Sequence, residues 1–145
     1  SKSKALAGIR LGYALGSEIL IKALFTAKDS FNSYPVDTLA QKICSIAMED
    51  TAYYDAINKK ITQSREFLAA SLKKLGWIVL PSRANFIFAG IPGKGAKEIY
   101  LTLKDHGILV RYFDIPGIKN FVRITIGTEE HMNILIKKVK ELFSL

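Results

Sequence analysis

The chain begins with the stretch Ser1-Lys2-Ser3-Lys4-Ala5-Leu6-Ala7-Gly8-Ile9-Arg10-Leu11-Gly12-Tyr13. Lys2 stands among small residues, Arg10 follows eight residues later, and glycines lie on both sides of the arginine. A lysine amine can form an imine with an aldehyde where its surroundings keep part of it deprotonated. An arginine presents a planar fork of donors that suits a phosphate. The glycines let the backbone turn and approach a ligand closely.

An amine and a guanidinium in one short segment fit a ligand that carries both an aldehyde and a phosphate. Pyridoxal 5'-phosphate is a cofactor of that kind, and enzymes hold it on a lysine. The simpler interpretation is a flexible basic terminus followed by a short buried strand over residues 11–15. The opening segment alone does not decide between the two, so the rest of the sequence must.

The pattern S-K-x-x-x-L-A-G-x-R-x-G-Y resembles the Schiff-base segment of fold-type I pyridoxal-phosphate aminotransferases, and most closely that of the histidinol-phosphate aminotransferase family. The resemblance implies that Lys2 is the catalytic, cofactor-binding lysine and that Ser1 and Arg10 bind the cofactor phosphate. Lys4 is a rival for the imine, but its spacing to Arg10 is two residues shorter than the family's spacing.

Four later phrases match the same family in the same order: Phe31-Asn32-Ser33-Tyr34-Pro35, Ser82-Arg83-Ala84-Asn85-Phe86, Gly107-Ile108-Leu109-Val110-Arg111 and Val122-Arg123-Ile124-Thr125-Ile126-Gly127-Thr128. The likeness is therefore collinear over essentially the whole chain. In the family a large domain precedes the lysine and supplies a carboxylate for the pyridine nitrogen, a stacking ring and further phosphate ligands. The resemblance thus implies a C-terminal part of a longer enzyme, inactive by itself.

Composition places the chain among ordinary globular proteins. Its 145 residues can bury one core, and hydrophobic residues at 49% and charged residues at 23% are typical values. No apolar run approaches the roughly 20 residues that a membrane helix needs. Cys44 is the one cysteine, which leaves no internal disulfide, and a cytoplasmic origin is the default expectation.

A net charge of +8 and a pI near 9.6 raise the possibility of nucleic-acid binding. The lysines, however, are spread over predicted helices in runs of at most two, and no zinc spacing or RNA-binding aromatic motif accompanies them. Solvated helix faces explain this charge better, since net charge speaks to solubility and non-specific association. We therefore expect neither a nucleic acid nor a membrane as partner.

The periodicity of the sequence changes at Gly76. Before it, apolar residues at helical spacing predict helices over residues 17–28, from Asp37 or Thr38 onward, and from Asp50 or Thr51 to Gly76. After it, short apolar runs predict strands over 77–80, 85–89, 108–113 and 121–126, with helices over 96–106 and from Thr128 onward.

This order of elements predicts an α+β fold class, with a mostly antiparallel sheet packed by helices. The resemblance implies a parent of the α/β class overall. It also implies three parts: residues 1–50 as a remnant of the large cofactor-binding domain, 51–76 as a bridging helix, and 77–145 as a small C-terminal domain.

Two arginines, Arg111 and Arg123, interrupt predicted strands that are otherwise apolar. Strand alternation places Arg123 on the face opposite Val122 and Ile124, and Arg111 on the same face as Phe113. An arginine there is costly unless it meets a carboxylate, a phosphate or solvent. The alternative for each is a surface salt bridge on an edge strand. The resemblance implies that both bind the anionic groups of the substrates.

The leading hypothesis is that the parent is a pyridoxal-phosphate-dependent aminotransferase of histidine biosynthesis. The resemblance implies a homodimer that converts histidinol phosphate and 2-oxoglutarate to imidazole acetol phosphate and glutamate. Another fold-type I enzyme, such as an amino-acid-phosphate decarboxylase or an aromatic aminotransferase, stays open because fold does not fix reaction. A non-catalytic basic binding module is a third candidate, disfavoured by the Lys2–Arg10 spacing and the strand arginines.

Overall fold

The computed structural model describes residues 2–143, and the chain divides into two compact units. One unit extends to Ala56 and the other begins at Ile57, so the division falls inside helix α3 (Thr51–Lys74). None of the helices over residues 2–143 is both long and apolar enough to cross a membrane.

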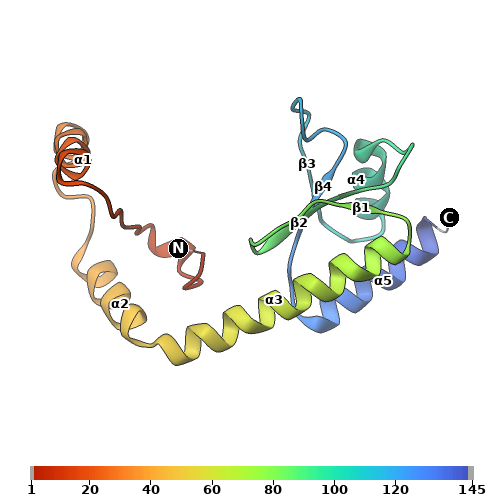
Figure 1. Ribbon diagram of the computed structural model, residues 1–145, viewed down its shortest axis with the longest axis horizontal. Helices are drawn as coiled ribbons and strands as arrows, with labels where there is room; N and C mark the ends of the chain where they lie inside the picture. The colour runs from red at the N-terminus through yellow and green to blue at the C-terminus, as the bar shows by residue number, and fades with distance from the viewer. Residues whose placement is uncertain (1, 144–145) are drawn as a thin grey trace. The chain divides into compact units, whose positions relative to one another are not determined.

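The first unit contains, before α3, a 3-10 turn η1 (Ala7–Ile9) and the helices α1 (Glu18–Phe31) and α2 (Thr38–Glu49) (Figure 1). Asp37 begins α2, because its carboxylate accepts a 2.8 Å hydrogen bond from the Ala40 amide. The Asp50 carboxylate accepts a 3.3 Å bond from the Tyr53 amide and so caps α3. Ser17 occupies the N-cap position of α1, but its side chain makes no capping bond. The predicted helix starts are therefore confirmed. Where the sequence left an aspartate and a threonine as alternative caps, the aspartate is the cap.

The strand predicted over residues 11–15 is wrong. This segment has no regular structure, and Tyr13 and Leu15 are 77% and 90% exposed. A strand needs a neighbour to bond its backbone groups, and the described part of the first unit contains no strand.

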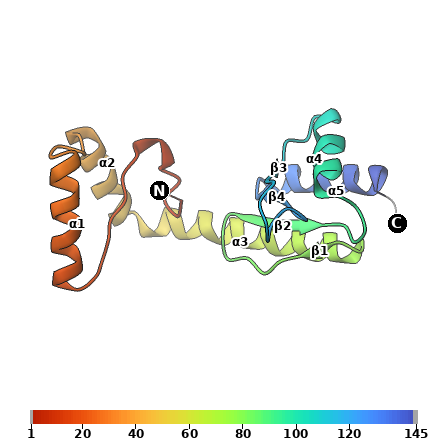
Figure 2. The same ribbon diagram turned by 90° about the horizontal axis from the view of Figure 1, so that it is seen from above.

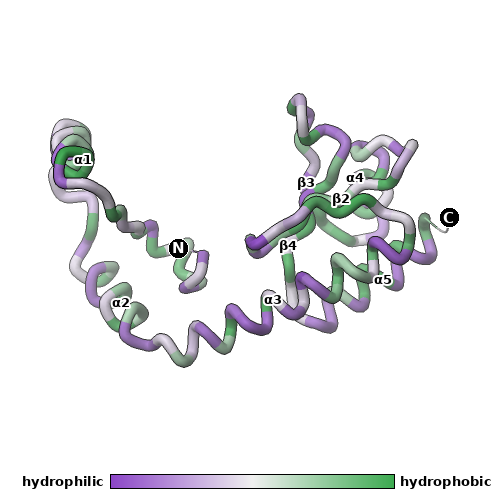
Figure 3. Tube along the Cα trace, viewed as in Figure 1, coloured by the Kyte–Doolittle hydropathy of each residue, from purple (hydrophilic) through white to green (hydrophobic). Residues whose placement is uncertain are grey.

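The apolar stripes of α1 and α2 are also largely exposed. Leu39 and Ile46 of α2 are exposed, whereas Ala40 and Ala47 are the buried apolar residues that the described part of this unit contributes. Figure 3 shows hydrophobic stretches along α1. Sequence periodicity thus located the helices of this unit correctly but not what covers them.

The second unit follows the predicted order of strands and helices: β1 (Ile78–Val79), β2 (Phe86–Gly90), α4 (Ala96–Asp105), β3 (Arg111–Tyr112), β4 (Val122–Thr125) and α5 (Glu129–Leu142). The four strands form one sheet in the order β1-β2-β4-β3, and every neighbouring pair is antiparallel. The predicted α+β class with an antiparallel sheet is confirmed.

Strand β3 is much shorter than the predicted 108–113, and the end of α4 accounts for the loss of its first residue. Gly107 adopts a left-handed φ of 77°, and the Ile108 amide donates a 2.9 Å bond to the Leu103 carbonyl. This pattern closes the last turn of the helix and satisfies its free carbonyls. The Ile108 amide is therefore bonded to the helix end and cannot donate to a neighbouring strand.

One face of the sheet and three helices build the core of the second unit. Its buried side chains include Ile87 and Ala89 of β2, Val122 and Ile124 of β4, Leu68 and Leu72 of α3, Ile99 and Leu103 of α4, and Met132, Leu135 and Val139 of α5. Helices α3 and α5 run side by side (Figure 2). Because strand residues alternate between faces, the other face of the sheet carries Phe86, Phe88 and Arg123.

Candidate functional site

Arg111 and Arg123 are cross-strand partners in the sheet of the second unit. The register of β3 and β4 places Arg111 directly opposite Arg123. Like charges in such a pair repel and destabilise a sheet unless another group offsets them. The structure therefore brings together the two arginines that the sequence singled out, in an arrangement that needs compensation.

Aromatic rings supply part of that compensation. The guanidinium carbon of Arg123 lies 5.2 Å from the ring centroid of Phe86 and 5.6 Å from that of Phe113. The guanidinium carbon of Arg111 lies 5.1 Å from the same Phe113 ring. A cation within about 6 Å of a ring centroid is attracted by the electron-rich face of the ring. Phe113 therefore contacts both guanidinium groups, and Phe86 contacts one of them.

Among the described residues, no carboxylate offsets the two charges. Within residues 2–143, no acidic side chain forms an ion pair with either arginine. The Nε–H of Arg123 is buried and has no hydrogen-bond acceptor there. Leaving a buried donor unpaired is costly, and more so for a charged group. These two features together favour a site for an external anion, which a guanidinium can hold with two parallel hydrogen bonds.

Tyr112 and Asp114 form a separate contact beside the arginines. The Tyr112 hydroxyl donates a 3.4 Å hydrogen bond to Asp114. Burial first, and then the charge and hydrogen bond of Asp114, raise the pKa of Tyr112 above its usual value of 10.0. Tyr112 therefore keeps its proton at neutral pH. Asp114 is the acidic residue nearest to Arg111 in sequence. It is hydrogen-bonded to Tyr112 and, within the described residues, forms no ion pair with Arg111.

Lys2 and Arg10 lie in the first unit, at the two ends of one turning segment. Both side chains are exposed. The Lys2 carbonyl accepts a 3.1 Å bond from the Ala5 amide, and Arg10 follows η1 with a left-handed φ of 59°. Ala5 also has a positive φ, of 49°. Side-chain-bearing residues adopt this conformation at a cost, and such positions gather at functional loops.

The rival lysine is engaged elsewhere. The Nζ atom of Lys4 lies 4.4 Å from the ring centroid of Tyr54. Within the described residues, the Lys2 amine makes no hydrogen bond or ion pair. Of the two lysines, Lys2 has the amine free to meet a ligand. Ser1, predicted as a phosphate ligand, lies outside the described residues.

A cavity of about 270 Å³ lies beside Arg10 in the first unit. Its walls are Gly8 to Leu11 on one side, and Pro35, Val36, Asp37, Leu39 and Ala40 on the other. The Asp37 carboxylate in this wall is already bonded to the Ala40 amide. The segment that carries Arg10 is therefore adjacent to the segment that follows the Asn-Ser-Tyr-Pro phrase.

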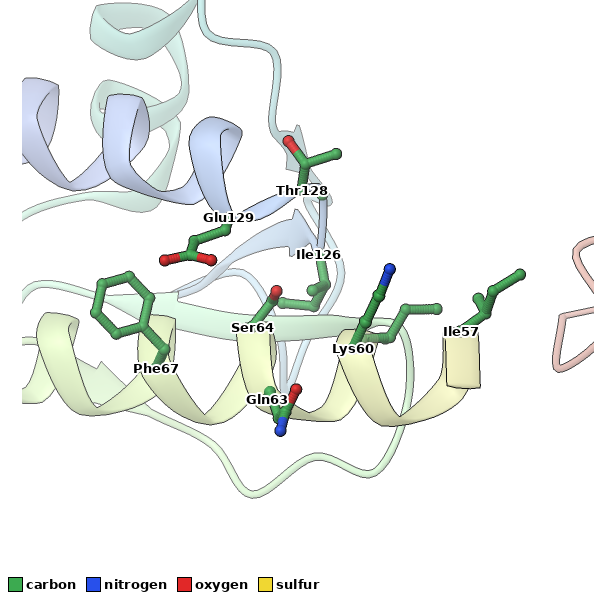
Figure 4. A pocket seen from close by; sticks show the side chains of 10 residues that line it. Ile57, Lys60, Gln63, Ser64, Phe67, Ile126, Thr128 and Glu129 are labelled. Atoms are coloured by element: carbon green, nitrogen blue, oxygen red, sulfur yellow. The ribbon is translucent and has the colours of Figure 1, made fainter. Parts of the chain in front are cut away.

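A groove of about 790 Å³ contains none of the predicted site residues. It lies in the second unit between α3 and the start of α5, and Figure 4 shows Lys60, Ser64 and Phe67 on one side and Glu129 on the other. Within residues 2–143, Lys60 and Glu129 form no ion pair. Hydrophobic residues make up much of the remaining wall. We assign no chemistry to this groove.

Sequence reasoning missed the role of the phenylalanines. The sequence pattern places Phe113 on the same face as Arg111 but gives it no function, and Phe86 stands only within a matched phrase. The available signal was the alternation of Phe86 and Phe88 with the core residues Ile87 and Ala89, which puts aromatic rings on the arginine face.

Among residues 2–143, no cluster of three metal-ligating side chains occurs.

Known proteins resemble the whole chain. The histidinol-phosphate aminotransferase of Syntrophus aciditrophicus is 54% identical over 143 residues, which cover 99% of this chain and 40% of that protein. The solved histidinol-phosphate aminotransferase from Sinorhizobium meliloti, in complex with pyridoxal-5'-phosphate, superposes with a TM-score of 0.83 at 27% identity, over 97% of this chain and 38% of that one. A decarboxylase from Sulfurospirillum multivorans gives a TM-score of 0.79 at 26% identity, over 95% of this chain and 40% of that one.

The chain spans about 40% of the length of the curated relatives it matches. The likeness to solved aminotransferases agrees with the predicted fold-type I origin of the fold. A family model, that of the class I and II aminotransferases, matches residues 1–139. Because that match covers nearly the entire chain, the protein belongs to the aminotransferase class I and II family.

Proposed function

We propose that the full-length protein is a pyridoxal-phosphate-dependent histidinol-phosphate aminotransferase. The observation that carries the proposal is the pair Arg111 and Arg123, which has no carboxylate partner within residues 2–143 and one buried, unbonded Nε–H. Such a pair suits an anionic substrate. The relative from Syntrophus aciditrophicus that bears this name, at 54% identity, supports the choice of substrate.

The donor groups of the first unit fit the cofactor. Pyridoxal phosphate offers an aldehyde and a phosphate, and the segment presents an exposed amine on Lys2 and an exposed guanidinium on Arg10. Lys2 would hold the cofactor through its side-chain nitrogen, and Arg10 would hold its phosphate. Ser1 joins them as a proposed phosphate ligand on the resemblance alone. The solved relative from Sinorhizobium meliloti in complex with this cofactor supports the assignment.

Each residue then has a defined task. When bound, the cofactor supplies the electron sink for the reaction. The Lys2 amine would take and return the proton at the substrate carbon that bears the amino group, as general base and then as general acid. Arg111 and Arg123 would hold the phosphate of histidinol phosphate and, in the other half-reaction, a carboxylate of 2-oxoglutarate. The cytoplasmic location and the homodimer expected from the sequence stay predictions.

A decarboxylase is the second candidate, because a protein of that description shares the fold at 26% identity. The two reactions release different products from their substrates, so one experiment separates them. Purified full-length protein is incubated with pyridoxal phosphate and histidinol phosphate, and the cofactor is assayed for conversion to its amino form. A parallel incubation with an amino-acid phosphate is assayed for carbon dioxide. Glutamate formation is followed after 2-oxoglutarate is added.

We expect conversion of the cofactor and stoichiometric glutamate. Release of carbon dioxide from an amino-acid phosphate, without cofactor conversion by histidinol phosphate, would favour the decarboxylase. Sedimentation of the same preparation tests the homodimer, and a monomer at micromolar concentration would contradict it.

A further inference from the structure

The ring of Phe113 lies against both guanidinium groups of the arginine pair. Its centroid is 5.1 Å from the guanidinium carbon of Arg111 and 5.6 Å from that of Arg123. We propose that Phe113 is a positioning residue for anion binding, which holds the two arginines together so that one anion can meet both. The role of this anion as a substrate group rests on the proposed function, whereas anion binding itself does not.

The proposal begins from the repulsion between the two arginines. Arg111 and Arg123 are direct cross-strand partners, and no carboxylate within the described residues offsets their charges. Without another contact, the exposed Arg111 and the half-buried Arg123 would turn their guanidinium groups away from each other. The aromatic ring is the contact that the two side chains share. Its electron-rich face attracts each cation without neutralising it.

This type of contact leaves the guanidinium groups able to bind. A carboxylate partner would occupy the in-plane N–H donors, which are the same donors that an anionic ligand needs. A ring attracts the cation through its face and accepts no conventional hydrogen bond. The buried, unbonded Nε–H of Arg123 is consistent with a donor that is reserved in this way. Phe86, 5.2 Å from the same guanidinium carbon, limits the movement of Arg123 further.

A neighbouring ring offers a control for packing. Phe88 lies in the same cluster, with its centroid 5.8 Å from that of Phe86 and 6.5 Å from that of Phe113. Phe88 is the cross-strand partner of Arg123, but none of the cation–π contacts of the two arginines within residues 2–143 involves its ring. Removing the Phe88 ring therefore disturbs aromatic packing of the same kind without deleting a ring that makes one of these cation–π contacts.

The test compares Phe113→Leu, Phe113→Met, Phe113→Tyr and Phe88→Leu in the full-length protein. Methionine keeps more of the side-chain volume, in case leucine prevents folding, and tyrosine restores the aromatic face. Binding of inorganic phosphate and of glutarate is measured by calorimetry, with no turnover involved. Values of kcat and KM for both substrates, cofactor affinity and thermal unfolding are measured in parallel.

Loss of the ring at position 113 should weaken phosphate and glutarate binding roughly three- to thirtyfold, since each cation–π contact is modest. KM should rise for both substrates, while kcat and cofactor affinity stay near wild type. Phe113→Tyr should return the anion affinity to within about twofold of wild type. Phe88→Leu should lower thermal stability but keep anion affinity.

Two results would overturn the proposal. Equal losses of anion affinity in Phe113→Leu and Phe88→Leu would mean that the rings only pack. Unchanged anion affinity in both Phe113→Leu and Phe113→Met would mean that the arginines need no positioning ring. A wild-type protein without aminotransferase activity, whose phosphate affinity still depends on Phe113, would contradict the proposed function and leave the positioning role intact.

Discussion

The amine of Lys4 lies over the ring of Tyr54, with 4.4 Å between the Nζ atom and the ring centroid. Lys2, two residues earlier, has an exposed side chain with no such contact among the described residues. The two lysines of the opening segment are therefore not equivalent, although the sequence makes them rivals. An amine that is engaged with a ring is less accessible to an aldehyde than one without such a contact, and the ring favours its charged form.

Replacing Lys2 by alanine in the full-length protein should abolish transamination, because the substitution removes the group that attaches the cofactor and moves the proton. Borohydride reduction followed by peptide mapping should find the cofactor on Lys2. Lys4→Ala is the matched control and should keep most of the activity. Label on Lys4 in the wild-type protein would contradict the assignment.

Replacing Arg123 by alanine should weaken both the amino donor and the oxo acid acceptor by about 2–5 kcal/mol, provided that bound substrate buries the contact. Cofactor affinity should hardly change. Arg83→Ala removes an exposed arginine outside the pair and should leave KM for both substrates unaltered. Normal kinetics with a lower melting temperature would make Arg123 a structural residue only.

Tyr112 should titrate later than an ordinary tyrosine. Its pKa is raised in the folded protein, mainly by burial and further by Asp114. The unfolded chain therefore loses this proton first as pH rises, so stability is fully present below the unfolded pKa of 10.0 and is lost as pH rises through the folded pKa.

Tyr112→Phe should consequently resist alkaline unfolding better than wild type. Asp114→Asn should move the tyrosine titration toward lower pH, as ultraviolet difference spectra against Tyr112→Phe would record. A tyrosine titration that is the same with and without Asp114 would exclude the contribution of that carboxylate.

Two leucines of α4 should respond very differently to truncation. Leu103 is fully buried in the core of the second unit, whereas Leu101 on the same helix is 44% exposed. Leu103→Ala should cost about 2–5 kcal/mol of unfolding free energy, through lost burial and a residual cavity. Leu101→Ala should cost well under half as much. Urea unfolding of the two variants measures the difference. Equal losses of unfolding free energy would mean that α4 does not bury Leu103 in preference to Leu101.

The second unit could be predicted closely because its sequence carries its own core. Val122 and Ile124 alternate with Arg123 so clearly that strand, face and burial all follow from the pattern, and the structure confirms each of them. The first unit was predicted less well. Residues 11–15 are apolar enough for a strand but have no neighbouring strand in the described part of that unit. Periodicity reports which side of a segment is apolar, not what covers it.

The contact of Phe113 with Arg111 and Arg123 could not be predicted from the sequence, for a different reason. It depends on the register of β3 against β4, which pairs Arg111 with Arg123. Nothing local fixes that register, because β3 has only two residues and a long connection precedes β4. Assignment of Lys2 and Arg10 came from a recognised pattern, and their roles stay predictions.

The order of the strands gives the two arginines unequal freedom. Arg123 is on β4, an inner strand with β2 on one side and β3 on the other, so its backbone is held from both directions. Arg111 is on β3, a two-residue strand at the edge of the sheet. Anions of different size need different separations between the guanidinium groups if they are to contact both. The fixed arginine then acts as the reference point, and adaptation from a small carboxylate to a larger phosphate ester falls to the edge strand.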